Sequence, residues 1–248
     1  MYDRIIEMIK SCVGCEPVQH VDTLDDLGLG GIDCDICGNK GYLTETRDGV
    51  LYTKECECMK KRRSLRSIRK SGMEDMLSRY TFESYEAPDD KRKNIVALAK
   101  RFAKKDDGWF FITGKSGSGK SHICTAICKE LIDRNKEVKY MLWRDESAAL
   151  KACITDSEEY GKKISKLKEV PVLYIDDFWK GGVTEADIRL SFEILNARYC
   201  DAKKRTIIST EMSLKDIVAM DEAVGSRIFE RSKGYRIIAP NENYRLRE

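Results

Sequence analysis

The octapeptide GKSGSGKS constrains the fold of this chain more than any other segment. It fits the pattern G-x-x-x-x-G-K-[ST], it follows the apolar run WFFIT (109–113), and a helix-period segment comes after it. Such a strand–loop–helix unit points backbone amides at phosphate oxygens, while the lysine reaches the β- and γ-phosphates and the last hydroxyl reaches Mg²⁺. The predicted nucleotide-binding residues are Gly114, Lys115, Ser116, Gly117, Ser118, Gly119, Lys120 and Ser121.

The surrounding chain alternates short apolar runs with helix-period segments. The apolar or β-branched runs are WFFIT (109–113), VKYMLW (138–143), VPVLYID (170–176), RTIIST (205–210) and YRIIA (235–239). Segments of helical length and period, such as 121–135 and 184–200, lie between them. Strands alternating with helices of this length predict an α/β fold, in which a parallel sheet is flanked by helices.

A second signal for the nucleotide site lies in VLYIDDF (172–178). An apolar strand would carry Asp176 and Asp177 to the carboxyl edge of the sheet, where α/β proteins bind ligands. We expect Asp176, together with Ser121, to hold Mg²⁺, and Asp177 to orient or deprotonate the attacking water. His122 is expected to make packing or polar contacts and not to bind a metal.

Six of the ten cysteines lie within the first 58 residues, and their spacing leaves two tetrads open. Cys34-x2-Cys37 can combine with an earlier or with a later pair, and the gap is 18 residues in both cases. The earlier pair is Cys12 and Cys15, with His20 nearby; the later pair is Cys56 and Cys58. The other four cysteines, Cys124, Cys128, Cys153 and Cys200, are expected to be buried thiols.

We favour Cys34, Cys37, Cys56 and Cys58 as a closed, structural zinc site. Glycines follow the first pair (CDICGNKGY) and suit a tight knuckle whose amides point at sulfur. Asp48-Gly49 predicts a hairpin turn that leads a strand back to the second pair. A module of about 60 residues buries too little apolar surface to be stable alone, so the metal would supply folding energy.

Five motifs, taken in order, resemble those of AAA+ ATPases of the DnaC/DnaI/IstB group, the bacterial replicative helicase loaders and their transposition relatives. They are GKSGSGKS, VLYIDDF, TIIST (206–210), GSRIFER (225–231) and NYRLR (243–247). The resemblance covers residues 75–248 and includes YTFESY (80–85), which in that family lies near adenine. It implies Walker A roles for Lys120 and Ser121 and Walker B roles for Asp176 and Asp177. It also supports the favoured cysteine tetrad, because small loaders commonly carry a similar element.

The same resemblance implies roles for two arginines. Arg227 matches the arginine finger that reaches the γ-phosphate of a neighbouring subunit, and Arg245 matches the arginine of sensor 2. The chain departs from the family at sensor 1, where Thr210 or Glu211 stands in place of the common Asn. Asp177 also replaces a commoner Glu, so we expect slow hydrolysis.

The expected organisation is a zinc-binding, helicase-interacting module (1–58), a basic helical linker (59–79) and an AAA+ ATPase domain (80–248). Seven of the eleven residues from 60 to 70 are basic, and this run could contact single-stranded DNA. A solvated helix face, with Leu65 and Ile68 packed inward, is the simpler interpretation. The segment 144–156 is a second, weaker candidate for DNA contact. The net charge of +3 is too small to indicate nucleic acid by itself.

The resemblance thus implies an ATP-dependent loader that binds a replicative helicase through its N-terminal module and delivers it to single-stranded DNA. ATP at an interface between self-associated subunits would switch assembly and release, with ATP, Mg²⁺ and Zn²⁺ as cofactors. Three alternatives remain open: an IstB-like transposition helper ATPase, a P-loop small-molecule kinase and a zinc-dependent DNA-binding regulator. We see no signal peptide and no membrane-spanning run, so we expect a cytoplasmic protein.

Overall fold

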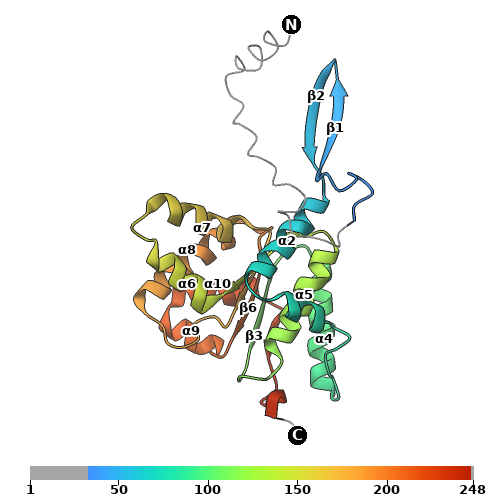
Figure 1. Ribbon diagram of the computed structural model, residues 1–248. Helices are drawn as coiled ribbons and strands as arrows, with labels where there is room; N and C mark the ends of the chain where they lie inside the picture. The colour runs from blue at the N-terminus through green and yellow to red at the C-terminus, as the bar shows by residue number, and fades with distance from the viewer. Residues whose placement is uncertain (1–32, 247–248) are drawn as a thin grey trace.

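The computed structural model describes residues 33–246 of the chain, and a five-stranded parallel sheet lies at its centre (Figure 1). The strand order is β4-β5-β6-β3-β7. The strands are β3 (Trp109–Thr113), β4 (Val138–Leu142), β5 (Val172–Asp176), β6 (Arg205–Thr210) and β7 (Arg236–Ile238). All five apolar runs form strands, so the predicted α/β fold with a parallel sheet flanked by helices is confirmed.

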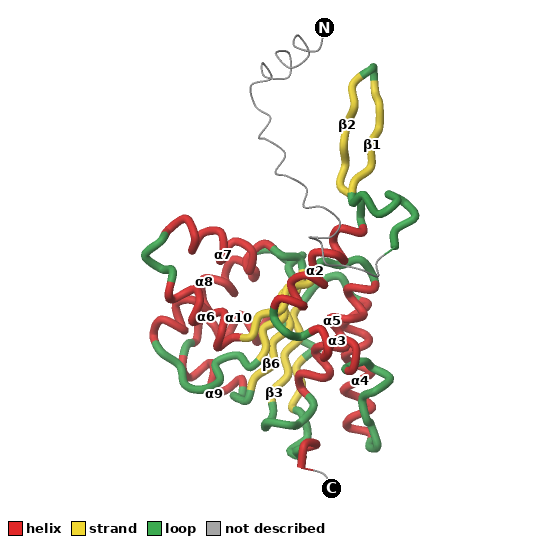
Figure 2. Tube along the Cα trace, in the orientation of Figure 1, coloured by secondary structure: helices red, strands yellow, loops and turns green. Residues whose placement is uncertain are grey.

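Helices cover both faces of this sheet, as Figure 2 shows. One face packs against α2 (Cys58–Lys70), α3 (Glu74–Arg79), α4 (Asp90–Lys104) and α5 (Lys120–Asp133). The other face packs against α6 (Trp143–Ala152), α7 (Ser157–Glu169), α8 (Glu185–Tyr199), α9 (Leu214–Met220) and α10 (Glu222–Arg231). The described part ends in a one-turn 3-10 helix, η1 (Tyr244–Leu246).

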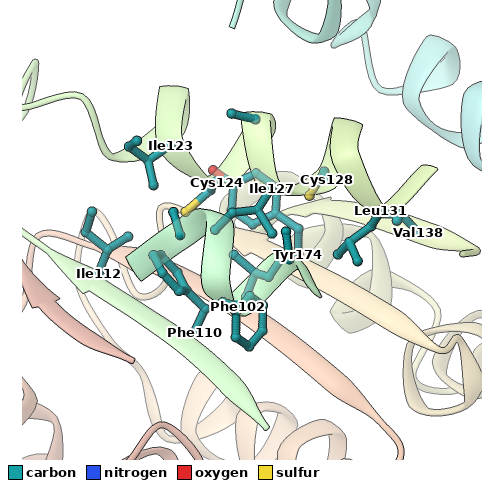
Figure 3. Close-up of a cluster of buried hydrophobic side chains, with 14 of the residues drawn as sticks. Phe102, Phe110, Ile112, Ile123, Cys124, Ile127, Cys128, Leu131, Val138 and Tyr174 are labelled. Carbon is teal, nitrogen blue, oxygen red and sulfur yellow. The ribbon is translucent and has the colours of Figure 1, made fainter. Parts of the chain in front are cut away.

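Side chains that alternate along each strand build the two apolar layers. In β3, Phe110 and Ile112 join the cluster under α4 and α5, whereas Trp109 and Phe111 join the cluster on the opposite face. Figure 3 shows the first cluster, with Phe110 and Ile112 below the apolar side of α5. Because both faces are covered, β3 and β5 are nearly continuous apolar runs and do not alternate with polar residues.

A two-stranded antiparallel hairpin precedes this body and projects from it in Figure 1. Its strands are β1 (Tyr42–Arg47) and β2 (Val50–Glu55). The predicted turn falls between them, with Asp48 and Gly49 both in the left-handed region, at φ 51° and 77°. That backbone suits a two-residue type I′ hairpin loop, which needs positive φ at both positions.

Helix α2 joins the hairpin to the body and ends before Ser71-Gly72. Leu65 and Ile68 pack into the cluster under α5. The basic side chains of its outer face are largely engaged in ion pairs within the chain. These pairs are Lys60–Glu57, Lys61–Asp133, Arg63–Glu55, Arg63–Glu137 and Arg69–Glu74.

Three of the four isolated cysteines are buried as expected, but Cys200 is exposed, which corrects the prediction. Cys200 is the C-cap of α8 and lies where the chain leaves the helix, so the apolar period of α8 no longer applies to it. None of the described helices combines the length and apolar character that crossing a bilayer requires.

A buried arginine joins the end of α7 to the start of β6 through hydrogen bonds to backbone carbonyls. The guanidinium of Arg198, on α8, is fully buried and donates to the carbonyls of Leu167, Val170 and Arg205, at 2.9, 2.8 and 2.6 Å. Its Nε donates to the Thr206 hydroxyl at 3.0 Å. The bonds to Leu167 and Val170 satisfy carbonyls at the end of α7 that have no partner within the helix, and the other two reach the start of β6.

We therefore expect Arg198→Ala to lower the free energy of unfolding by about 3 kcal/mol, because it leaves several buried carbonyls unpaired. For a chain of this size the thermal midpoint should fall by roughly 6–12 °C. The matched control is Arg189→Ala, on the same helix but 77% exposed, which should leave the midpoint nearly unchanged. Equal midpoints for the two variants would contradict the assignment.

Candidate functional site

The predicted phosphate loop connects β3 to α5, and its glycines are required by close neighbours. Gly117 and Gly119 have φ of 74° and 87°, a region that favours glycine. A Cβ on Gly117 would lie 1.9 Å from Oδ1 of Asn243, and one on Gly119 would lie 3.0 Å from the ring of Tyr85. The loop is thus packed between the C-terminal segment and the segment ahead of α4.

Lys120 lies inside this loop and is only 5% exposed. Its Nζ donates to the carbonyls of Gly114 and Lys115, at 2.8 and 2.9 Å. Burial lowers the pKa of Lys120, and the carboxylates of Glu211 and Asp177 counter that effect. The hydroxyl of Ser118 is also buried and has no hydrogen-bond partner among the described residues. A buried cation and an unpaired hydroxyl in a glycine-rich loop fit a bound phosphate chain.

Asp176 ends β5 and faces the start of α5. The Ser121 hydroxyl donates to its Oδ1 at 3.2 Å, and the Tyr140 hydroxyl donates to its Oδ2 at 3.2 Å. The Ser209 hydroxyl, from β6, donates to Oδ1 as well. Asp176 is 4% exposed, so these donors compensate for most of the lost hydration. The Asp176 carboxylate and the Ser121 hydroxyl are oxygen ligands of the kind that Mg²⁺ prefers, and they could hold it here.

Asp177 follows in an unusual backbone conformation. Its φ is 52°, and its amide donates to Oδ1 of Asp176 and to the Ser209 hydroxyl, at 3.1 and 3.2 Å. Its Oδ2 accepts from Nζ of Lys180 at 3.1 Å, and Lys180 also pairs with Glu211 at 3.0 Å. A non-glycine residue in this region is strained, and such strain concentrates at functional sites.

The two residues considered for sensor 1 face different ways. Glu211 lines the cleft beside Lys180. The Thr210 hydroxyl donates instead to the carbonyl of Phe178 at 2.7 Å, and Thr210 is fully buried. The structure therefore brings Glu211, and not Thr210, to the site.

The loop and the aspartates form one end of a cleft of about 500 Å³, whose other wall is aromatic. Tyr80 stacks on the ring of His122 at a centroid distance of 4.6 Å, and Tyr85 meets that ring edge-on at 5.1 Å. Nε2 of His122 donates to the Thr81 carbonyl at 2.9 Å, and burial lowers the pKa of His122. His122 makes packing and polar contacts, as predicted. The aromatic wall to which it belongs offers a flat apolar surface on which the base of a nucleotide could lie.

The C-terminal segment closes the third side of the cleft. The amide of Tyr244 donates to the Gly117 carbonyl at 3.0 Å, and Tyr244 lines the cleft. Arg92, buried on α4, pairs with Glu242 at 2.7 Å and lies 5.1 Å from the centre of the Tyr244 ring. Arg245 lies in η1, next to this contact; its side chain falls outside what the structure describes.

Arg227 lies on α10 and does not line the cleft of its own chain. Its Nε donates to Oδ1 of Asn196 at 3.1 Å, and its guanidinium lies 4.8 Å from the ring centre of Phe192 and 5.3 Å from that of Tyr199. All three partners are on α8. Arg227 is thus held, half-buried, between α8 and α10, apart from the residues that line the cleft.

The four favoured cysteines come together at the base of the hairpin. Their sulfurs lie within 4.8 Å of one another, and the Cys34–Cys56 and Cys37–Cys58 sulfur pairs are both 3.7 Å apart. Four thiolates at about 2.3 Å from one zinc ion would lie about 3.8 Å apart, so the geometry fits a closed tetrahedral site. Cys12, Cys15 and His20 lie outside the described residues.

Local contacts shape this cluster for a metal. The Gly41 amide donates to the Cys37 sulfur at 3.3 Å, which is the knuckle expected from the glycines. Although burial works to raise it, the pKa of Cys37 falls to about 7, because this amide and the neighbouring thiols stabilise its thiolate. Burial among the other thiols raises the pKa of Cys58 to about 12. A divalent cation would let all four sulfurs ionise together.

Several site residues were not anticipated from the sequence. Ser209 and Tyr140 reach Asp176 because β6 and β4 flank β5, and that strand order cannot be read from a single sequence. Lys180, in the loop after β5, had a signal: it follows Asp177 by three residues and precedes two glycines. Arg92 had none, because its partner Glu242 is 150 residues away.

Comparison with known proteins places the chain in a family of ATP-binding proteins. The profile of the family described as IstB-like ATP binding protein matches residues 42–248. YqaM of Bacillus subtilis, described as uncharacterized, is 29% identical over 79% of this chain and 66% of its own length. The phage-like element PBSX protein XkdC of B. subtilis is 26% identical over 86% and 85%. The replicative helicase loader DnaC of Escherichia coli is 25% identical over 68% and 69%.

Solved structures show the same fold. The crystal structure of the DnaC helicase loader superposes with a TM-score of 0.59 and 20% identity, over 66% of this chain and 98% of that one. The crystal structure of DnaI gives a TM-score of 0.56 and 21% identity, over 68% and 92%. These likenesses confirm the predicted P-loop α/β architecture.

If the tetrad binds zinc, the purified chain should carry one equivalent by elemental analysis. Cys37→Ser should lose it, because three thiolates bind zinc far more weakly than four. A strong chelator should expose residues 34–58 to limited proteolysis first, since this part has little apolar core. The control is Cys200→Ser, which changes an exposed cysteine outside the tetrad. This variant should still carry one equivalent of zinc. Loss of structure in the ATPase part before the hairpin would contradict the assignment.

Proposed function

The chain belongs to the family of IstB-like ATP binding proteins, and from this premise we propose that it is an ATP-dependent loader of a replicative DNA helicase. In this proposal the module around the four cysteines contacts the helicase, and the ATPase part assembles with further copies of the chain. ATP binding drives that assembly, and hydrolysis releases it. The helicase is thereby delivered to single-stranded DNA.

The separation of Arg227 from the nucleotide cleft carries this proposal. The cleft has a phosphate loop, a buried Lys120 and a paired Asp176, but none of its described residues is a cation from α10. Phosphoryl transfer is strongly accelerated by a guanidinium that stabilises charge on the transferred group. Arg227 on a second copy can supply it, so a complete ATPase site requires two subunits. Nucleotide state and assembly are then linked.

In the proposed reaction, the residues that line the cleft or lie next to it have separate roles. Lys120 and the loop amides bind the β- and γ-phosphates, and Ser121 and Asp176 would hold a Mg²⁺ ion, which would neutralise developing charge. Asp177 orients the attacking water, and Arg245, in the turn next to the loop, adds a second guanidinium. The reaction yields ADP and phosphate, and we expect it to be slow without partners.

A replicative helicase is the favoured partner because relatives named as replicative helicase loaders match two thirds of the chain. The cysteine module adds a part that an isolated ATPase does not need. The second candidate is a transposition helper ATPase, which the family description itself favours. It would bind duplex DNA and a transposase.

A capture assay tests the proposal. The full chain is immobilised and offered the replicative helicase of the same host with ATP, with ADP and without nucleotide. We expect the immobilised chain to retain the helicase. The amount retained should depend on ATP, and it should differ in Lys120→Ala, whose phosphate loop is disabled. The second candidate predicts that the chain retains a transposase and duplex DNA and does not retain the helicase. That result would overturn the loader assignment.

The two-subunit site makes a separate prediction for Arg227→Ala. Basal ATP turnover should fall at least tenfold, since finger arginines contribute up to ~10³–10⁵ in rate. Mixing Arg227→Ala with Lys120→Ala should restore part of the turnover, because each variant supplies what the other lacks. Arg231→Ala, on the same helix, is the control and should behave as wild type. Unchanged turnover and unchanged self-association in Arg227→Ala would refute the shared site.

A further inference from the structure

Lys180 lies between two carboxylates at the mouth of the nucleotide cleft. Its Nζ is 3.1 Å from Oδ2 of Asp177 and 3.0 Å from Oε1 of Glu211. The side chains are partly exposed, at 43% for Lys180, 27% for Asp177 and 37% for Glu211. All three line the cleft that contains the phosphate loop. Lys180 is therefore close enough to affect the water-orienting carboxylate.

The backbone ahead of Lys180 is fixed. The Asp177 amide is bound by Asp176 and Ser209, and the Phe178 amide donates to the Ser209 carbonyl at 2.8 Å. Trp179 is 2% exposed and stacks on Phe178 with ring centres 4.7 Å apart. Its indole Nε1 donates to the buried Ser191 hydroxyl on α8 at 2.7 Å. The Asp177 carboxylate thus projects from an anchored main chain.

The backbone after Lys180 is not held in this way. Gly181 and Gly182 have φ of 91° and 105°, and a Cβ added to either would meet nothing within 4 Å. Two glycines in open space leave the chain many alternative conformations. Lys180 thus stands at the boundary between an anchored segment and one that can move, so its ammonium can leave Asp177 while Asp177 stays in place.

We propose that Lys180 is a positioning residue that restrains Asp177 in the resting subunit. The Lys180 ammonium donates to Oδ2 of Asp177, an atom that would otherwise accept a hydrogen bond from the attacking water. Glu211 holds the ammonium from its other side, so Lys180 stays at the mouth of the cleft. Movement at Gly181-Gly182 withdraws the ammonium and frees the carboxylate. The inference rests on the proposed ATPase function and gives a physical reason for slow basal hydrolysis.

An alternative role for Lys180 would be direct contact with the terminal phosphate. The two roles predict opposite effects of neutralising the side chain. A restraint, once removed, raises kcat and leaves the KM for ATP nearly unchanged, because the phosphate loop is intact. A phosphate contact, once removed, lowers kcat and weakens ATP binding.

The test is steady-state ATP turnover of the full chain with Lys180→Gln, Lys180→Arg and wild type, with ATP affinity measured by calorimetry. We expect Lys180→Gln to raise basal kcat by about threefold to fivefold, which corresponds to the loss of one partly exposed ion pair. The KM and the calorimetric affinity should change by less than about twofold on the same grounds. Lys180→Arg keeps the ion pair and should stay near wild type. A kcat of Lys180→Gln equal to or below that of wild type overturns the proposal.

A double-mutant cycle separates restraint of Asp177 from a general effect on the loop. Asp177→Asn alone should lower turnover, and adding Lys180→Gln to it should change nothing further, because the restrained group is gone. A rise in the double variant as large as that in Lys180→Gln alone would overturn the proposal. If wild type hydrolyses ATP and Lys180→Gln has no effect, the restraint alone fails. If wild type hydrolyses no ATP, the proposed ATPase function fails, and the restraint fails with it.

Discussion

The carboxylate of Asp176 accepts hydrogen bonds from three separate elements of the fold. Ser121 comes from the first turn of α5, Tyr140 from β4 and Ser209 from β6. A buried carboxylate is stable only when such donors replace its water shell. The same bonds fix the phosphate loop relative to the carboxyl edge of the sheet. Both the order of the core and the geometry of the nucleotide site thus depend on this one side chain.

The path from the cysteine cluster to the nucleotide cleft is short and continuous. Cys58 is both a member of the cluster and the first residue of α2. Further along α2, the Ser64 hydroxyl accepts from the amide of Val138 at the start of β4, at 2.8 Å. The chain then turns at Gly72 into α3, where Met76 lines the cleft. Packed elements thus join the hairpin to the nucleotide cleft, which suits the proposed coupling between a partner and the nucleotide.

On the opposite face of the sheet, α8 connects the loop after Asp177 to Arg227. The loop after Asp177 is anchored by Trp179 to Ser191 on α8, and α8 in turn holds Arg227 through Asn196. The loop beside the nucleotide cleft is therefore attached to the helix that positions the arginine proposed to act in a neighbouring subunit. Since α8 is packed on both sides, it can transmit a displacement as a rigid element. In the proposed assembly this links successive sites.

The sequence by itself determined the fold class and the phosphate loop, and it indicated the two aspartates and the favoured one of two cysteine tetrads, because each depends on residues close together in the chain or on the period of apolar residues. Lys120 and Ser121 are adjacent, and the turn at Asp48-Gly49 is local. The tertiary structure decided which residues surround them. Ser209 meets Asp176, and Arg92 meets Glu242, only because of strand order and helix packing. Such contacts join distant parts of the chain, and a single sequence carries no record of which distant residues become neighbours.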